Sequence, residues 1–366
     1  MSFQCGIVGL PNVGKSTLFN ALTESGIPAE NYPFCTIEPH IGIVELPDGR
    51  LKDLAKIYSP EKVTPATVEF IDIAGLVKGA SKGEGLGNQF LGQIRQTSAI
   101  LHVVRCFDDK NITHVDGSID PVRDVETIKT ELLLADILTI EKRKHKVEKL
   151  ARSGDREAKS SLYVLDLLLE HCSDGNAARL LEVDEGYKEF KRALQLLTEK
   201  PVLYIANTSE VEAMEDNAGE HVRCLKGYAS KENNVVISLC SSIEQEIALL
   251  KEEEKPIFLQ EYGLSEPGLN KVIRSSFELL GLHNFFTCGE KEVKSWTISK
   301  GSTAPQAAGN IHSDFERGFI KADTFHYSEL IENGSEKALK ELGLIRQEGK
   351  DYIVKDGDCI FFKFNV

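Results

Sequence analysis

The chain has no apolar run approaching the ~18 residues needed to cross a bilayer. Its eight cysteines include no C-x-x-C pair, and its nine histidines show no metal-ligand spacing. These absences argue against a membrane protein, a zinc site and a disulfide framework. Cys5, Cys106 and Cys240 fall in apolar strand-like runs, where buried reduced thiols are expected. Because the amino terminus begins with a strand pattern and not a signal peptide, we expect a cytoplasmic protein with no membrane partner.

Basic residues are also in short supply. The 43 Lys and Arg against 57 Asp and Glu leave a formal net charge of −14, which argues against general nucleic-acid binding and against a DNA partner. One local basic cluster exists: Lys142, Arg143, Lys144, Lys146, Lys149 and Arg152. This cluster is either a solvated helix face or a surface that neutralises RNA phosphates.

Strand-like runs alternate with helical segments in two parts of the chain. The runs are residues 3–8, 41–46, 68–73, 99–106, 201–206 and 234–239. Near-continuous apolar strands separated by helices predict an α/β fold with a mainly parallel sheet covered on both faces. The 366 residues are enough for about two to three domains.

The segment 121–200 has no strand pattern and predicts an inserted antiparallel helical coiled coil. Apolar residues recur in it at helical spacing: Ile128, Leu132, Ala135, Leu138, Val147 and Leu150. Residues 153–155 form a break, and a second apolar run spans 162–169. The alternative is another layer of core helices, because a long charged helix can also lie flat on a sheet.

The carboxyl-terminal part predicts a separate α+β domain. Its strand-like runs are 285–287, 293–298, 352–354 and 359–364, with a tight turn at 355–358 before the last. We therefore predict a nucleotide-binding domain over 1–120 and 201–280, a helical arm over 121–200, and a third domain over 281–366.

A phosphate-binding loop is the most informative motif. Residues 9–16 fit G-x-x-x-x-G-K-[ST], between the strand at 3–8 and a predicted helix at 17–22. Backbone N–H groups of such a loop cradle phosphates, with Lys15 reaching the β and γ oxygens and Ser16 binding Mg²⁺. The positive end of the following helix adds to the attraction.

Two further segments complete a candidate nucleotide site. Asp72 and Gly75 form a D-x-x-G after an apolar strand, where Asp72 can hold a Mg²⁺ water and Gly75 can donate its N–H to a γ-phosphate. Thr36 lies between the two motifs, where switch-type nucleotide hydrolases place a threonine on Mg²⁺. An ordinary strand-edge threonine is the alternative.

Leu76 follows Gly75, where Ras-like enzymes carry a glutamine that orients the attacking water. Because leucine has neither a donor nor an acceptor, hydrolysis needs another group or is very slow. His114 is the candidate, since a histidine handles protons near neutral pH. A polar loop histidine without a catalytic role is the alternative.

The base-reading motif is altered as well. GTPases use N-K-x-D after a strand, whereas this chain has Asn207, Thr208, Ser209 and Glu210. Without the aspartate, the two guanine N–H groups lose their paired acceptor, which is costly in a buried site. We therefore expect adenine, read by Asn207 and groups near Thr208, with GTP binding more weakly than ATP.

Taken together, these segments resemble the YchF family of Obg-like ATPases over essentially the whole chain. The matching stretches are 9–16, 31–39, 72–77, 80–88, 304–309, 314–320 and 355–358. The resemblance implies a G-domain-like core, an antiparallel coiled coil and a carboxyl-terminal β-grasp unit of the TGS type. It also implies ATP preference and association with ribosomes.

The resemblance implies residue roles too. The phosphate-loop residues of the family correspond to Asn12, Val13, Gly14, Lys15, Ser16 and Thr17, which join Gly9 in the predicted site. Its Mg²⁺ ligands correspond to Ser16 and Thr36, and its proposed catalytic histidine to His114. In similar proteins with a hydrophobic residue after D-x-x-G, K⁺ held by the phosphate-loop asparagine assists the reaction, which makes K⁺ at Asn12 a further candidate cofactor.

Three functions fit these features. The leading one is a slow ATPase switch that binds the ribosome and modulates translation or a stress response. The others are a GTPase with a degenerate base motif, and a nucleotide-gated ribosome-binding scaffold with negligible turnover, which Leu76 favours.

Overall fold

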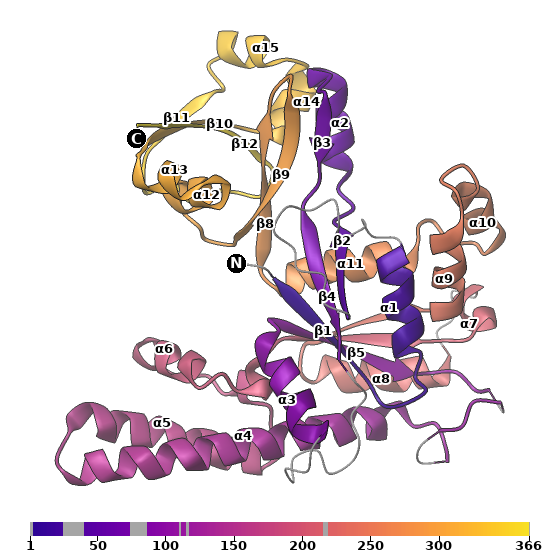
Figure 1. Ribbon diagram of the computed structural model, residues 1–366, viewed down its shortest axis with the longest axis vertical. Coiled ribbons are helices and arrows are strands. Elements are labelled where there is room, and N and C mark those ends of the chain that lie inside the picture. The colour runs from indigo at the N-terminus through magenta and orange to yellow at the C-terminus, as the bar shows by residue number, and fades with distance from the viewer. Residues whose placement is uncertain are drawn as a thin grey trace. The chain divides into compact units, whose positions relative to one another are not determined.

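The computed structural model describes residues 3–24, 40–73, 86–109, 111–114, 117–214 and 219–365 (Figure 1). The chain divides into two compact units. The first comprises Met1–Ile43 and Glu69–Val272, and the second comprises Val44–Val68 and Ile273–Val366.

A six-stranded sheet organises the first unit, in the order β2-β4-β1-β5-β6-β7. The strands are β1 (Gln4–Val8), β2 (Ile41–Glu45), β4 (Thr67–Asp72), β5 (Ala99–Arg105), β6 (Val202–Asn207) and β7 (Val235–Leu239). The pairs from β4 through β7 are parallel. Every residue of β5 and β6 is buried, as expected for central strands covered on both faces. The predicted α/β class and mainly parallel sheet are confirmed.

Helices connect these strands and bury one apolar side. In α1, for example, the buried side consists of Leu18, Ala21 and Leu22. The helices of this unit outside the arm are α1 (Lys15–Glu24), α3 (Leu86–Gln96), α7 (Glu210–Met214), α8 (Glu220–Ser230), α9 (Ser241–Leu249) and α10 (Lys255–Glu261). Helix α11 (Gly268–Leu279) begins in the first unit, and its residues from Ile273 on belong to the second.

The segment 121–200 forms the predicted helical hairpin. Helices α4 (Pro121–Arg152) and α5 (Arg156–Ser173) run side by side and are joined at the predicted break (Figure 1). Aspartates cap both amino termini: Asp120 accepts from Arg123 N at 3.1 Å, and Asp155 from Ala158 N at 3.0 Å. The 3₁₀ helix η3 (Ala178–Leu180), α6 (Glu185–Ala193) and the 3₁₀ helix η4 (Leu197–Glu199) complete the segment.

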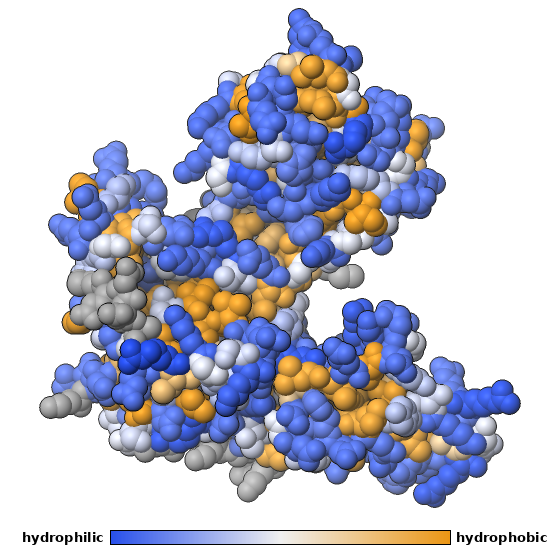
Figure 2. All heavy atoms as spheres, turned by 180° about the vertical axis from the view of Figure 1, so that it is seen from behind, coloured by the Kyte–Doolittle hydropathy of each residue, from blue (hydrophilic) through white to orange (hydrophobic). Residues whose placement is uncertain are grey.

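One part of the arm prediction is wrong. Leu138 and Leu150 were expected in the apolar stripe, but 55% and 57% of their surfaces are exposed. The buried stripe toward α5 includes Ile140 and Val147. The first half of α4 packs against the sheet and α8, so two different sides of one helix are buried and a single stripe does not describe it. Figure 2 shows hydrophobic spheres among hydrophilic ones on the arm.

The second unit contains its own six-stranded sheet, in the order β11-β10-β12-β8-β9-β3. Its strands are β3 (Lys62–Thr64), β8 (Leu282–Cys288), β9 (Glu292–Ser299), β10 (Phe319–His326), β11 (Arg346–Glu348) and β12 (Asp358–Phe364). Its helices are α2 (Gly49–Tyr58), α12 (Ala304–Ile311), α13 (Ser313–Arg317), α14 (Tyr327–Asn333) and α15 (Glu336–Glu341). The predicted strand at 352–354 is wrong, since only Ile353 forms an isolated bridge, with Thr303.

The placement of residues 44–68 also corrects the sequence analysis, which assigned them to the nucleotide-binding domain. They belong to the second unit because β3 pairs in parallel with β9, which is distant in sequence. Leu51 and Leu54 of α2 are buried in a core with Phe286 and Leu330. Residues 273–280, also predicted in the nucleotide-binding domain, belong to the second unit as well. Apart from these differences, the three-domain division stays a prediction.

Two smaller expectations can be compared with the structure. Cys5, Cys106 and Cys240 are buried free thiols, as predicted. Burial raises the pKa of Cys106 to about 12 and so keeps its thiol protonated. Within the described ranges, no helix is long and apolar enough to cross a membrane.

Candidate functional site

The phosphate loop joins β1, a central strand with parallel neighbours on both sides, to α1. Gly9 follows β1 directly, and Asn12 and Gly14 have positive φ angles of 62° and 92°. These left-handed residues turn the chain so that the first residue of α1 is Lys15. The loop therefore lies at the carboxyl end of the sheet, next to a helix amino terminus that favours anions.

Lys15 and Asp72, two residues of the predicted site, meet in this region. Asp72 ends β4, whose residues pair in parallel with β1, and its Oδ1 forms an ion pair with Lys15 Nζ. Their side chains are 11% and 15% exposed, so the two charges neutralise each other in a largely enclosed position. A nucleotide phosphate at the loop would compete with Asp72 for the ammonium group of Lys15.

Ser16 lies exposed in the first turn of α1, and Thr17 follows it. The Ser16 hydroxyl and the Asp72 carboxylate are oxygen donors of the kind that Mg²⁺ binds. Over the described ranges, no three His, Cys, Asp or Glu side chains form a metal-binding group. Thr36, Gly75 and Leu76 lie outside the described residues.

The segment that carries His114 reaches the phosphate loop through its neighbour. Asn12 Nδ2 donates to Thr113 O at 3.1 Å. The His114 side chain is buried, and its Nε2 lies 2.9 Å from Oδ2 of Asp124 in the first turn of α4. Asp124 is only 2% exposed, and the sequence analysis missed it. A carboxylate in a first helical turn gives no signal of its own in the sequence.

Arg105 was missed as well, although it holds this segment in place. It is 1% exposed at the end of β5, and its guanidinium donates to the carbonyl oxygens of Phe107, Asp109 and Ile112 at 3.0–3.2 Å. A buried charge needs such partners. The available signal was an arginine ending a largely apolar strand.

Asn207, the first residue of the base motif, is hydrogen-bonded to the phosphate loop and so helps to hold it in place. Its Nδ2 donates to Val13 O at 2.9 Å, and its Oδ1 accepts from Ser241 N at 2.9 Å. A Cβ on Gly14 would lie 2.1 Å from Asn207 Nδ2, so the loop and the amide are in direct contact. This buried amide thus ties the phosphate loop to the start of α9.

The other base-motif residues are arranged differently. Thr208 is buried, and both its N–H and its hydroxyl donate to Leu239 O, at 2.9 and 3.2 Å. Glu210 is exposed at the start of α7. Thr208 also lines a cavity of about 400 Å³ beside the edge strand β7. On the cavity wall, burial raises the pKa of Glu244, although its carboxylate accepts from the N–H groups of Gly268 and Leu269.

A phosphate loop on a central parallel strand, with an aspartate ending the neighbouring strand, defines a P-loop nucleotide-binding protein of the GTPase-like class. The model of a family described as "50S ribosome-binding GTPase" matches residues 4–132. A second family, YchF-GTPase_C, described as a protein of unknown function (DUF933), matches residues 282–365.

Full-length relatives are more specific. The chain is 53% identical to the "Ribosome-binding ATPase YchF" of Bacillus subtilis and 54% identical to that of Escherichia coli O157:H7, each over 100% of both chains. The solved structure of the YchF GTPase from Schizosaccharomyces pombe matches with a TM-score of 0.91 and 37% identity, covering 99% of this chain and 98% of that one. The chain belongs to the YchF family.

Proposed function

We propose that this protein is a slow ATPase that binds Mg²⁺·ATP at the phosphate loop and associates with the ribosome in a nucleotide-dependent manner. The observation that carries the proposal is the meeting of Lys15 and Asp72 beside a phosphate loop at the carboxyl end of the parallel sheet. The bacterial relatives are named ribosome-binding ATPases, which supports both ATP hydrolysis and ribosome association.

In this proposal, the triphosphate is bound by the phosphate loop, and Mg²⁺ by Ser16, Thr36 and Asp72. The set contributed by the loop is Gly9, Asn12, Val13, Gly14, Lys15, Ser16 and Thr17. The bound ion would neutralise phosphate charge, while Gly75 would donate its N–H to the γ-phosphate. Lys15→Ala should abolish ATP binding measured by calorimetry, and Lys52→Ala, at an exposed position of α2, is the matched control. Unchanged ATP binding by Lys15→Ala would refute the assignment.

Base preference would depend on groups other than the Asn207 side chain. The side-chain amide of Asn207 is already bonded to Val13 and Ser241, so its main contribution would be to hold the loop that binds the phosphates. Reading of the base would then fall to groups near Thr208 and Glu210. The fission yeast relative of known structure is named a GTPase, which keeps GTP as the alternative. Dissociation constants for ATP and GTP at equal Mg²⁺ decide between them, and tighter GTP binding would overturn the adenine assignment.

His114 is proposed to handle the proton of the attacking water, with Asp124 orienting the imidazole. The 2.9 Å separation of their side chains and the bond from Asn12 to Thr113 support this role. Single-turnover hydrolysis should slow about 10²- to 10⁴-fold in His114→Ala. An unchanged rate would show that His114 takes no part in the chemistry, and a negligible rate in the parent protein would favour the scaffold alternative.

K⁺ is a further proposed cofactor, at Asn12. Asn12 donates from Nδ2 to Thr113 O, so its Oδ1 is the atom that would bind the ion. Faster hydrolysis in K⁺ than in Na⁺ is expected, and equal rates would remove K⁺ from the proposal.

The basic cluster on α4 is proposed as the RNA-binding surface. Lys144 is paired with Asp166 at 2.6 Å, and Arg152 lies 3.9 Å from Glu148. The other four cations have no ion pair within the described part of the chain: Lys142, Arg143, Lys146 and Lys149. Free cations on one helix suit phosphate neutralisation, which weakens as salt rises.

Ribosome co-sedimentation across a salt series tests this surface. Glutamine at those four positions should reduce the slope of log affinity against log salt concentration, by about 0.7–0.9 for each phosphate that is no longer neutralised. The matched control replaces four exposed lysines elsewhere with glutamine: Lys231, Lys251, Lys337 and Lys340. An identical slope in the arm variant and the parent would leave the cluster as a solvated helix face.

A further inference from the structure

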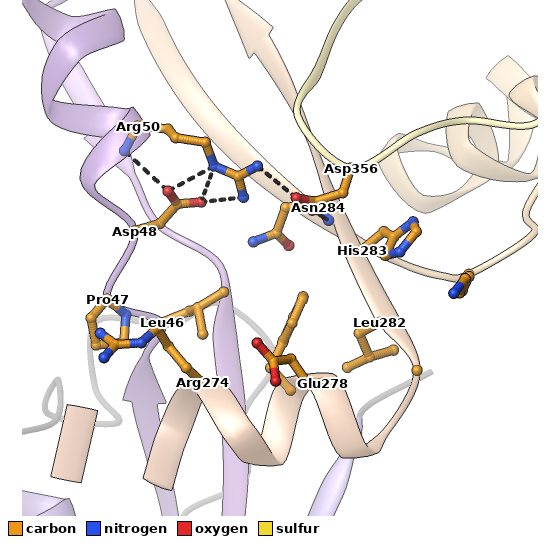
Figure 3. A pocket seen from close by; sticks show the side chains of 13 residues that line it. Leu46, Pro47, Asp48, Arg50, Arg274, Glu278, Leu282, His283, Asn284 and Asp356 are labelled. Atoms are coloured by element: carbon orange, nitrogen blue, oxygen red, sulfur yellow. Dashed lines mark hydrogen bonds and ion pairs between the residues drawn. The ribbon is translucent and has the colours of Figure 1, made fainter. Parts of the chain in front are cut away.

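The second unit contains a polar cavity that the nucleotide site does not use. Its volume is about 440 Å³, and all of its lining residues belong to the second unit. It lies between the start of α2, the end of α11 and the first residues of β8 (Figure 3). None of the residues assigned to the phosphate loop or to Mg²⁺ lines it.

A clamp of three charged side chains fixes one wall. Arg50 donates from Nε and Nη2 to Asp48, at 2.8–3.1 Å, and from Nη1 to Asp356 Oδ2 at 2.7 Å (Figure 3). The guanidinium also lies over the Phe286 ring, 5.0 Å from its centroid. Both carboxylates are thus occupied by one cation. A guanidinium has five N–H groups, so one hydrogen on each Nη remains for a ligand.

Asn284 supplies the second observation. It is fully buried in β8, its N–H donates to Asp356 Oδ1 at 2.8 Å, and its Oδ1 accepts from Thr297 Oγ1 at 3.3 Å. Its Nδ2 is buried with no hydrogen-bond partner among the described residues, and the amide points into the cavity (Figure 3). A buried amide without an acceptor is costly. The cavity wall therefore presents N–H donors that call for a ligand oxygen.

The charge balance restricts what that ligand can be. Three cations line the cavity, Arg50, Arg274 and Lys300, and so do three carboxylates, Asp48, Glu278 and Asp356. Their formal charges cancel, which disfavours a phosphate ester carrying two negative charges and no cation. Glu278 is exposed and has no ion pair within the described ranges, so it can accept from a ligand ammonium group. A zwitterion satisfies both requirements.

We propose that this cavity binds a free α-amino acid. Its carboxylate accepts from Asn284 Nδ2 and from the remaining N–H groups of Arg50. Its ammonium group donates to Glu278 at the rim. The buried side chains of Leu46 and Leu282 supply an apolar wall for the amino-acid side chain. The volume exceeds that of any single amino acid, which leaves room for water to bridge the remaining polar groups.

Calorimetry on the full chain with each standard amino acid in turn tests the proposal. At least one amino acid should bind at micromolar to millimolar concentration, and Asn284→Asp should weaken it about ten- to hundredfold, because a carboxylate replaces the donor. Glu278→Gln, an exposed change, should reduce the preference for the amino acid over its 2-hydroxy-acid analogue about two- to fivefold. Glu341→Gln, an exposed glutamate of α15, is the matched control.

The inference does not depend on the proposed ATPase function, so Lys15→Ala should bind the amino acid as the parent does. Binding that disappears in Lys15→Ala, or that survives both cavity substitutions, would overturn the proposal. So would the absence of binding heat for every amino acid. Should Asn284→Asp lose its native circular dichroism spectrum, the preference ratio of Glu278→Gln decides alone.

Discussion

The close approach of Gly14 to Asn207 allows a quantitative test of how the phosphate loop is held. Gly14→Ala should have two costs. The φ of 92° is unfavourable for any residue with a Cβ, by about 1–2 kcal/mol. The new Cβ, 2.1 Å from Asn207 Nδ2, would also displace the amide and break its hydrogen bonds to Val13 and Ser241. Two buried hydrogen bonds contribute about 1 kcal/mol each, and more where a partner is left unsatisfied.

We therefore expect Gly14→Ala to lower the free energy of unfolding of the first unit by about 3–5 kcal/mol. In an Asn207→Ala background the second cost is already present, so Gly14→Ala should add only about 1–2 kcal/mol. The coupling energy between the two positions is thus about 2 kcal/mol.

Urea unfolding followed by far-UV circular dichroism measures these values. Trp296, the single tryptophan, lies in the second unit, and its fluorescence transition should not move. Additivity of the two substitutions within about 0.5 kcal/mol would refute the proposed role of Asn207 in holding the phosphate loop.

Three further predictions follow from buried polar groups. Burial lowers the pKa of His102 to about 3, so below pH 6.5 the unfolded chain binds a proton that the native chain does not. The free energy of unfolding measured in urea should therefore fall by about 2 kcal/mol between pH 8 and pH 5, and His102→Gln should show a smaller fall. Asp136 accepts hydrogen bonds from Leu197 N, Thr198 N and Thr198 Oγ1 at 2.7–2.8 Å. Asp136→Ala should therefore lower the free energy of unfolding by about 2–4 kcal/mol, and a loss under about 1 kcal/mol would contradict an anchoring role. Arg105→Lys should speed hydrogen exchange in residues 107–114, because one ammonium group cannot serve three carbonyls fixed by a guanidinium, while exchange in β6 stays unchanged.

Local patterns predicted much of the first unit. The six strand-like runs each correspond to an observed strand, because buried strand positions are filled by apolar residues, most completely in the fully buried β5 and β6. The break at 153–155 marks the end of α4, where a short polar stretch cannot continue the apolar stripe. The loop at Gly9–Ser16 was found because its chemistry requires particular residues at fixed spacing.

Tertiary contacts between separate elements could not be predicted from local sequence patterns. The membership of residues 44–68 in the second unit depends on the pairing of β3 with β9. The placement of Asp124 against His114 depends on where α4 begins to pack. The two buried sides of α4 depend on which neighbour each half of the helix meets. In each case the deciding contact is a tertiary one, and no local period in the sequence records it.

The amino-acid sequence by itself determined the α/β class, the position of the phosphate loop and the family, because strand hydrophobicity and glycine-lysine spacing are local properties. Only the tertiary structure decided that Asn207 is bonded to the loop and that Lys15 meets Asp72. It also decided that the Nδ2 of buried Asn284, which has no acceptor among the described residues, faces a cavity. These are pairings of donors with acceptors across separate elements, and burial sets their energies, which appear only when the chain has folded.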